Sequence, residues 1–302
     1  MKRVVITGAT SFIGISLIEE WLKEACEIYA VVRPNSSNLS RIPMDKKINI
    51  VEREMAEYDR LSDDILYADF FYHLAWMGTR APYRDDKITQ EKNFFCTLKA
   101  FESAVEMGCS FFLGAGSQAE YGTTNGLVNE EHPCHPDSEY GKEKLRAYRN
   151  LSVKTGEMDI RFIWIRIFSV YGRYDYPGTL VMTAIDKMKK NMPMEMTLCT
   201  QLWDYLNVVD AARAMKLFAL RECENGVYNL ASGEYKPLKD FVEEIKKVIN
   251  SKSELLFGAI EYGLSVPVNL VPDVKKIKEA LQWQPEIGFS EGIKNMIESM
   301  EV

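Results

Sequence analysis

The segment KRVVITGATSFIGISL, residues 2–17, decides the fold of this chain. Residues 4–6 within it are apolar and β-branched, which predicts a strand buried on both faces. A turn begins directly after this strand at Gly8, where glycine lets the backbone bend tightly. Gly14 lets the next helix pack close to the strand, so that the helix N-terminus can face a pyrophosphate. The segment therefore predicts a strand, a tight turn and a helix in this order.

The size and composition of the chain narrow the classes of protein to which it can belong. A chain of 302 residues can bury a large core in one α/β domain or in two lobes. The formal charge of −7, without a block of Lys or Arg, argues against nucleic acid and against an anionic membrane as partners. The six cysteines form no CxxC pair, and no apolar run has the length of a membrane span or the place of a signal peptide. We therefore expect a cytoplasmic protein.

Residues 27–33, EIYAVVR, predict the second strand, and the residues at its end indicate the cofactor. In this fold an acidic residue at that place binds the adenosine ribose of NAD, whereas Arg and hydroxyl groups accommodate the 2′-phosphate of NADP. Here Arg33 ends the strand, Ser36 and Ser37 follow, and no acidic residue stands there. The sequence favours NADP(H), with NAD as the alternative.

Three more strands and one long helix are expected before residue 125. Residues 48–55 and 68–76 predict the third and fourth strands, and residues 111–122 contain the fifth, with Ser117 at its end. Residues 88–107 predict a helix with apolar residues on more than one face. Such a helix is deeply buried or is shared with a partner.

Two features of the chain invite a metal interpretation that we do not favour. The loop before Pro136 holds His132, Cys134 and His135, but their spacing is more compressed than that of common zinc sites and no fourth ligand is near in sequence. His73 lies within the predicted fourth strand, where we expect a packed histidine. We expect no metal site.

Tyr140 and Lys144 carry the chemistry that the sequence predicts. They lie four residues apart at the start of the helical stretch SEYGKEKLRAYRNL, so they share one helix face. A lysine at this position can lower the pKa of the tyrosine and bind the nicotinamide ribose, leaving the phenol able to exchange a proton. Ser117, at the end of a different strand, can hydrogen-bond the same substrate oxygen.

With these residues the chain resembles an extended short-chain dehydrogenase/reductase, in the NAD(P)-dependent nucleotide-sugar epimerase/dehydratase family. Its turn is similar to the family's GxxGxxG with Ser11 in place of the middle glycine. The other landmarks run nearly end to end: HLAW, GSQAEYG, YGKEK, RIFSVYG (166–172), WDYLNVVDAARA (203–214), VYNLASG (227–233) and LQWQP (281–285). Among subgroups, the chain looks most like the 4-ketoreductases that make CDP-linked dideoxyhexoses such as abequose and paratose.

The resemblance implies roles for individual residues. Ser117, Tyr140 and Lys144 become the catalytic residues. The cofactor contacts that it implies, besides Tyr140 and Lys144, are Gly8, Thr10, Ser11, Phe12, Ile13, Gly14, Arg33, Ser36, Ser37, Glu54, Met55, Leu74, Ala75, Phe168 and Val170. Two positions depart from the family: Gly263 stands where an arginine is expected for the nucleotide diphosphate, and Trp203 replaces the arginine of the family's "RD" pair.

The resemblance also implies an α/β fold with a doubly wound parallel sheet, organised in two lobes. Residues 1–165 would form an NADP-binding Rossmann domain to which residues 203–233 return, and residues 166–302 would form a smaller α/β lobe that binds the nucleotide sugar. Ligands should lie at the carboxyl ends of the strands, where the strand order reverses. Relatives pair the helices around residues 94–105 and 140–144 across a two-fold axis, so we expect a homodimer.

The function that we expect is NADPH-dependent reduction of a 4-keto nucleotide sugar. The alternative is a nucleotide-sugar 4-epimerase with tightly bound NAD(P). A 4,6-dehydratase is less favoured, because Gln118 and Ala119 stand where that subgroup has an Asp-Glu pair, although Glu120 lies beside them. A non-catalytic NADP-binding protein is also less favoured, because such relatives usually lose the tyrosine or the lysine, and this chain keeps both.

Overall fold

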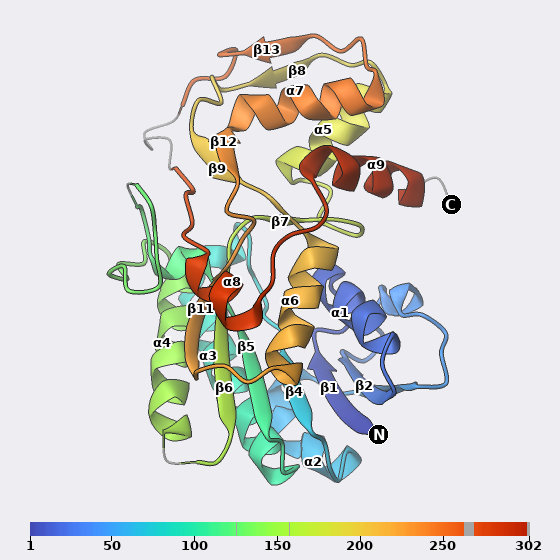
Figure 1. The fold of residues 1–302 in the computed structure, drawn as a ribbon, viewed down its shortest axis with the longest axis vertical. Helices are drawn as coiled ribbons and strands as arrows, with labels where there is room; N and C mark the ends of the chain where they lie inside the picture. The colour runs from blue at the N-terminus through green and yellow to red at the C-terminus, as the bar shows by residue number, and fades with distance from the viewer. Residues whose placement is uncertain (125, 157, 263–268, 301–302) are drawn as a thin grey trace.

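A seven-stranded parallel sheet forms the centre of the computed structural model, which describes residues 1–124, 126–156, 158–262 and 269–300. The strand order is β11-β6-β5-β4-β1-β2-β3, so the order reverses between β1 and β4 (Figure 1). The strands are β1 (Lys2–Thr7), β2 (Cys26–Val32), β3 (Ile48–Glu52), β4 (Phe70–His73), β5 (Phe111–Ser117), β6 (Arg161–Ile167) and β11 (Gly226–Leu230). The predicted doubly wound α/β fold is confirmed.

Helices cover both faces of the sheet because the residues of its central strands are apolar on both sides. One face packs against α1 (Phe12–Leu22), α6 (Val208–Leu220) and α8 (Lys275–Leu281). The other face packs against α3 (Lys87–Glu106), α4 (Glu139–Thr155) and the 3₁₀ turn η2 (Met55–Arg60), with α2 (Leu61–Asp64) beside them. In β1 the alternation is plain, since Val4 and Ile6 face the first layer and Val5 faces the second.

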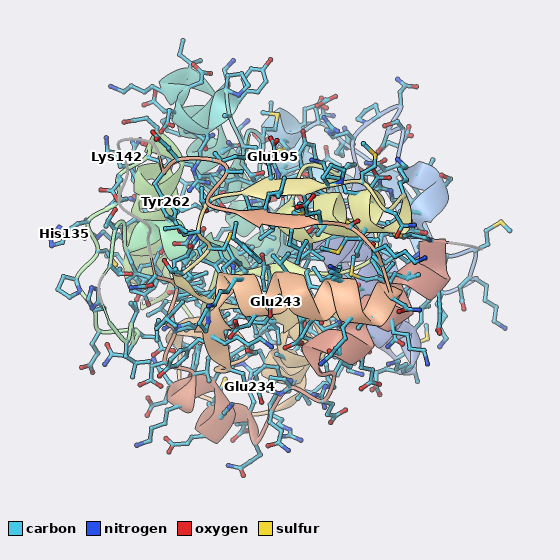
Figure 2. The ribbon with its side chains drawn as sticks, turned by 90° about the horizontal axis from the view of Figure 1, so that it is seen from above. His135, Lys142, Glu195, Glu234, Glu243 and Tyr262 are labelled. Carbon is cyan, nitrogen blue, oxygen red and sulfur yellow. The ribbon has the colours of Figure 1, made fainter. Side chains whose placement is uncertain are left out.

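A smaller α/β part lies above the carboxyl ends of these strands in Figure 1. It consists of β7 (Val170–Tyr171), α5 (Leu180–Lys189), β8 (Met194–Met196), β9 (Leu202–Asp204), β10 (Leu206–Asn207), β12 (Tyr235–Pro237), α7 (Leu238–Ile249), β13 (Leu255–Phe257) and α9 (Phe289–Met300). Its strands form the pairs β7–β10, β9–β12 and β8–β13, and its helices α5, α7 and α9 share a core of their own. Seen from above, α7 lies beside the pair β8–β13 and carries Glu243 (Figure 2).

β3 and β4 are shorter than the apolar runs that predict them, whereas β5 ends at Ser117 as expected. β3 ends at Glu52, because Met55 already begins η2. β5 ends at Ser117, whose hydroxyl accepts a hydrogen bond from the amide of Ala119 at 3.2 Å and thereby begins the 3₁₀ turn η4 (Gln118–Glu120). Each of these strands therefore ends in a turn at the edge of the sheet that faces the smaller part.

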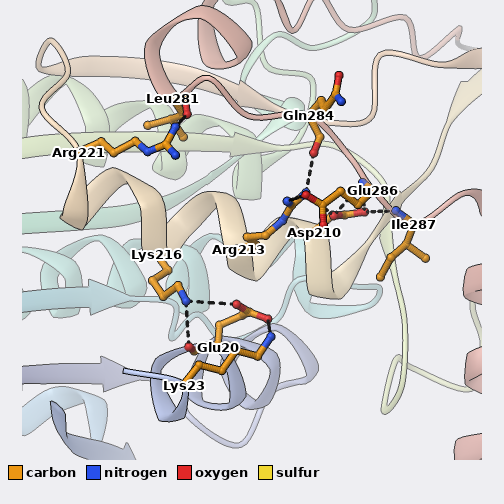
Figure 3. Close-up of polar contacts among 10 residues, drawn as sticks. All are labelled: Glu20, Lys23, Asp210, Arg213, Lys216, Arg221, Leu281, Gln284, Glu286 and Ile287. Carbon is orange, nitrogen blue, oxygen red and sulfur yellow. Dashed lines mark hydrogen bonds and ion pairs between the residues drawn. The ribbon is translucent and has the colours of Figure 1, made fainter. Parts of the chain in front are cut away.

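Asp210 in α6 ties the segment before α9 to the sheet layer (Figure 3). Its side chain is 1% exposed and accepts hydrogen bonds from the backbone amides of Glu286 and Ile287, at 3.1 and 2.9 Å. Arg213 donates to the same carboxylate at 2.8 Å. One buried carboxylate thus fixes the path of the chain into the last helix.

We predict that Asp210→Ala lowers the free energy of unfolding by about 2–4 kcal/mol, because it leaves two backbone amides without their acceptor. It also removes one hydrogen bond of Arg213, which still donates to Glu286 and to the carbonyl of Gln284. Asp186→Ala is the matched control, since Asp186 pairs with Lys190 within one exposed helix face, and it should change the same quantity by about 0.5 kcal/mol or less. Urea unfolding followed by circular dichroism measures both. Equal effects of the two substitutions would contradict this role of Asp210.

Candidate active site

Two joined clefts lie at the carboxyl ends of the strands. The larger has a volume of about 1120 Å³ and the smaller about 580 Å³, and both are lined by Ser11, Arg33 and Trp76. Gly8 and Met55 line the smaller cleft, whereas Ser117 and residues of the smaller part, such as Val181, line the larger one. A single ligand site usually measures about 300–1,000 Å³, so the joined clefts have room for two ligands.

The glycine turn after β1 forms one wall of these clefts. Gly8 has φ +67°, and a Cβ atom on Gly14 would lie 2.4 Å from the carbonyl oxygen of Gly8. Both positions therefore require glycine. Ser11 is the N-cap of α1, and its hydroxyl accepts a hydrogen bond from the amide of Gly14 at 3.0 Å. The serine that replaces the family's middle glycine thus caps the helix that begins at the cleft.

Most of the residues predicted to contact a cofactor line the clefts. These are Gly8, Thr10, Ser11, Phe12, Ile13, Arg33, Met55, Leu74, Ala75, Phe168 and Val170. Gly14, Ser36, Ser37 and Glu54 are not among the lining residues of the two clefts. The chain turns back after β2, where the amide of Ser36 donates to the carbonyl of Arg33 at 3.2 Å, and Asn38 reaches both clefts instead. Asn38 was not predicted as a cleft residue, although it is the next polar side chain along this turn.

Ser117, Tyr140 and Lys144 come together in the larger cleft. Ser117 lies at the end of β5, and the other two lie in the first turns of α4, whose N-cap is Ser138. The helix start is held close to η4, since a Cβ atom on Gly141 would lie 2.3 Å from the carbonyl oxygen of Ala119. The three side chains are nearly buried, so a ligand that reaches them is largely shielded from water.

Burial shifts the pKa values of the tyrosine and the lysine in opposite directions. Burial raises the pKa of Tyr140, while a hydrogen bond with Ser117 and the positive charge of Arg84 act to lower it. Burial lowers the pKa of Lys144 to about 7, and the negative charge of Glu120 opposes this shift. The cation that acts on Tyr140 is therefore Arg84 rather than Lys144, which differs from the expectation that the lysine lowers the pKa of the tyrosine.

The positions of the Arg84 and Lys144 side chains explain why Arg84 acts on Tyr140. The guanidinium of Arg84 lies over the Tyr140 ring, with its Cζ 4.6 Å from the ring centre. The Lys144 ammonium donates to the carbonyl of Ala115 at 2.5 Å and lies 3.7 Å from the centre of the Trp76 ring, but 5.9 Å from that of Tyr140. Trp76 is the last residue of the HLAW run, whereas nothing in the local sequence marks Arg84.

The histidines do not form a metal site among the described residues, where no group of three His, Cys, Asp or Glu side chains is placed to hold an ion. His73 is packed between Thr7 and Thr97, whose hydroxyls lie 2.9 and 3.1 Å from its ring nitrogens. Burial lowers its pKa to about 3, so it is neutral. His135 lies at the outer edge of the molecule (Figure 2).

Of the two departures from the family pattern, Trp203 lines the larger cleft, together with Tyr174, Tyr176 and Tyr205. Gly263 lies outside the described residues.

The described helices do not include one with the length and apolar character needed to cross a membrane.

Comparisons with known proteins agree with this geometry. A model of the NAD dependent epimerase/dehydratase family matches residues 4–231. The chain is 26% identical over 307 residues to a putative UDP-glucose 4-epimerase of Methanocaldococcus jannaschii, covering 99% of this chain and 98% of that protein. It is 24% identical over 311 residues to a CDP-abequose synthase of Salmonella muenchen, with coverage of 99% and 98%. The recognised resemblance is thus confirmed, and enzymes of more than one activity share it.

A solved structure extends the similarity to the whole fold. The UDP-glucose 4-epimerase of Thermotoga maritima, determined with UDP-glucose, superposes with a TM-score of 0.89 at 20% identity, covering 99% of this chain and 98% of that one. At this identity the match establishes the fold, including the smaller part above the sheet.

The buried lysine gives a pH-dependent prediction. Because the pKa of Lys144 is about 7 in the folded chain and 10.5 when exposed, the folded state binds fewer protons than the unfolded state between these values. The buried lysine therefore lowers the free energy of unfolding, by the full amount below pH 7 and by progressively less as the pH rises toward 10.5. Lys144→Met should therefore increase the free energy of unfolding by about 1–3 kcal/mol at pH 6, after the lost hydrogen bond to Ala115 is included, with a gain that fades by pH 10.

Urea unfolding from pH 6 to pH 10 measures this difference. Lys154→Met is the control on the same helix, because the side chain of Lys154 is 39% exposed and pairs with Glu102 at the surface. Its effect should not vary with pH. A Lys144→Met difference that stays constant over this range would contradict the shifted pKa.

Proposed function

The chain belongs to the NAD dependent epimerase/dehydratase family, and on this premise we propose that it reduces a 4-keto nucleotide sugar with NADPH. The observation that carries the proposal is the pairing of two features in one cleft. Ser117 and Tyr140 lie together at its inner end, and Arg33 lines it beyond the end of β2, with no acidic side chain from that strand end among the lining residues.

The cleft suits a dinucleotide. Gly8 and Gly14 have no room for a Cβ atom, so the end of β1 and the start of α1 lie close together. The turn between them can therefore present backbone amides to a pyrophosphate at the N-terminus of α1. Arg33 is an exposed cation placed for a 2′-phosphate, where NAD would require an acidic group. We propose the lining residues of the two clefts as the cofactor contacts, with Asn38 added and with Ser36, Ser37 and Glu54 in supporting places.

NADPH, when bound, supplies the hydride that reduces the carbonyl carbon at C4 of the sugar. Tyr140 donates the proton to the oxygen of that carbonyl as negative charge develops on it. Ser117 donates a hydrogen bond to the same oxygen and holds it in place. Lys144 would hold the nicotinamide ribose, and the charge of Arg84 favours loss of the proton from Tyr140.

The smaller part suits the nucleotide of the substrate. The wall that it contributes to the larger cleft includes the aromatic rings of Tyr174, Tyr176, Trp203 and Tyr205. Aromatic rings can stack on a base or on a sugar. We therefore propose that residues 166–302 bind the nucleotide sugar, while residues 1–165 with the return segment 203–233 bind the cofactor.

The main alternative is a nucleotide-sugar 4-epimerase, supported by the similarity to the putative UDP-glucose 4-epimerase. An epimerase keeps an oxidised cofactor bound and returns the hydride to the opposite sugar face, which suits NAD, whereas a reductase draws on NADPH. The residues around Arg33 and the similarity to a CDP-abequose synthase favour the reductase. Dehydration has little support, because Glu120 is completely buried in an ion pair with Arg166 and does not line the cleft.

A homodimer remains part of the proposal. On α3, Ile88 and Phe95 expose 65% and 49% of their surface, and on α4 Val153 exposes 71%, although both helices pack against the sheet with their other faces. Arg146 of α4 lies over Phe94 and Phe95 at 3.9 and 5.7 Å from the ring centres. A second copy of the same two helices would cover these apolar side chains.

The cofactor assignment predicts that Arg33→Ala weakens binding of NADPH by about 1.5–3 kcal/mol, the range of a hydrogen bond to a charged group. Binding of NADH should be nearly unchanged, since NADH lacks the 2′-phosphate. Fluorescence titration with both nucleotides measures the two affinities. An equal loss for both would remove Arg33 from cofactor discrimination.

The catalytic assignment predicts that Tyr140→Phe lowers turnover by about 10²–10⁴-fold, because the substitution removes the proton donor and keeps the ring. NADPH affinity should stay close to that of the unchanged protein. A panel of 4-keto-6-deoxy nucleotide sugars, with NADPH consumption followed by absorbance, measures turnover and tests the reaction itself. Turnover of Tyr140→Phe near the original rate would show that another group donates the proton.

A further inference from the structure

A buried ion pair lies directly behind the wall of the cleft that carries Ser117. Glu120 is completely buried, and one oxygen of its carboxylate accepts hydrogen bonds from the amide of Ser117 at 2.8 Å and from the indole of Trp164 at 3.0 Å. The other oxygen accepts from Arg166 Nε at 2.8 Å. The Arg166 side chain is 2% exposed, and its guanidinium lies 4.3 Å from the centre of the Tyr121 ring.

A single glycine, Gly116, lies between this ion pair and the cleft. Gly116 lines the cleft and is the register partner of Arg166 in β6. A Cβ atom on Gly116 would lie 2.3 Å from Trp164 Nε1 and 2.6 Å from Glu120 Oε1. Only a backbone without a side chain therefore separates the Glu120 carboxylate from the ligand space.

The same stretch of β5 holds Lys144. Its ammonium donates to the carbonyl of Ala115 and lies between the rings of Trp76 and Trp164, at 3.7 and 5.9 Å from their centres. Glu120 binds the amide of Ser117 and the indole of Trp164. The carboxylate thus contacts the neighbours of both groups while touching neither the ammonium nor the Ser117 hydroxyl.

Resting on the proposed function, we propose that the Glu120–Arg166 ion pair is a positioning device for the active site: it fixes the end of β5 so that the Ser117 hydroxyl faces the substrate, and it places a buried carboxylate behind the strand that Lys144 contacts. Burying an ion pair costs about as much free energy as the attraction of its charges returns, or more, so stability alone does not account for the pair. Its carboxylate instead holds the Ser117 amide at a fixed distance from the cleft.

The charged and titratable groups around the ion pair determine how the protonation of Lys144 should depend on pH. Lys144 is faced by Glu120 behind β5, by Tyr140 on its own helix and by His73 at the end of β4, while Arg84 lies over the far side of Tyr140. Glu120 is itself faced by Arg166, with the titratable groups of Tyr121 and Cys134 close by. Among these groups Glu120 is the anion that favours the ammonium form of Lys144, so removing its charge should let the lysine lose its proton at a lower pH.

The first test is Glu120→Gln, which keeps the shape and the acceptor oxygen but removes the charge. We expect kcat with a 4-keto nucleotide sugar to fall about 10–100-fold, with KM for the sugar changed less than about threefold, because the substitution acts on the reacting groups and not on the nucleotide site. We also expect the high-pH limb of the kcat profile to move to lower pH by at least about half a unit.

The matched control is Glu20→Gln at a second buried ion pair, between α1 and α6, shown in Figure 3. Glu20 is 4% exposed, and its carboxylate lies 3.4 Å from Lys216 Nζ, in a layer outside both clefts. This variant should keep the original kcat and pH profile even if its melting temperature falls. A loss of activity equal in both variants would mean that any buried ion pair is needed only for folding, and would overturn the proposal.

Glu120→Gln leaves Arg166 without its anion and can prevent folding, so the double variant Glu120→Gln/Arg166→Met is made in parallel. It removes both charges, and we expect a folded protein by circular dichroism with the same loss of kcat. A folded double variant with the original kcat and pH profile would overturn the proposal. Failure of both variants to fold would also count against it, because the pair would then be a requirement of the fold alone.

NADPH binding measured against pH, without any sugar, separates this inference from the proposed function. If no 4-keto sugar is reduced but the high-pH loss of NADPH binding moves to lower pH in Glu120→Gln and not in Glu20→Gln, the reductase assignment fails and the positioning role stands. If a sugar is reduced but neither kcat nor either pH profile changes in the Glu120 variants, the reductase assignment stands and the positioning role fails.

Discussion

The close approach of backbone to backbone at Gly8 and Gly14 is the constraint on which the rest of the structure depends. A Cβ atom on Gly8 would lie 2.8 Å from the amide nitrogen of Ala75, and one on Gly14 would lie 2.4 Å from the carbonyl oxygen of Gly8. The first contact joins the end of β1 to the end of β4, and the second brings the start of α1 onto the same turn. Because these three segments meet without side chains between them, a cleft opens at the point where the strand order reverses.

Buried polar side chains form the opposite wall of the cleft. Ser117, Lys144 and Glu120 are all buried, and their hydrogen bonds involve the backbone. The amide of Ser117 donates to the Glu120 carboxylate, and the Lys144 ammonium donates to the carbonyl of Ala115. Burial lowers the pKa of Lys144 to about 7, which makes its charge sensitive to neighbouring anions near neutral pH. The smaller part closes the space above these groups, with Asp204 at its base accepting three hydrogen bonds from Ser232 and Gly233. The site is thus assembled from both parts of the chain.

Much of this arrangement could be predicted from local sequence. The apolar runs predict the strands, the glycine turn predicts the first helix, and the spacing of Tyr140 and Lys144 predicts two side chains on one face of α4. The end of β5 at Ser117 was predicted, but the end of β3 was not, because it depends on the turn η2 that begins at Met55. The role of Arg166 depends on its register opposite Gly116 in the sheet, and Arg84 reaches Tyr140 only through packing between distant segments. Neither has a signal within its own stretch of sequence.

The central claim is that hydride passes from NADPH to C4 of a nucleotide sugar with net consumption of the cofactor. The most direct measurement uses NADPH that carries deuterium at both hydrogens of nicotinamide C4, a 4-keto-6-deoxy nucleotide sugar, and mass spectrometry with NMR of the product. The account predicts one deuterium at the sugar C4 for each NADPH oxidised. Interconversion of hexose nucleotides with no deuterium gained from the added NADPH would contradict it and identify an epimerase with a retained cofactor.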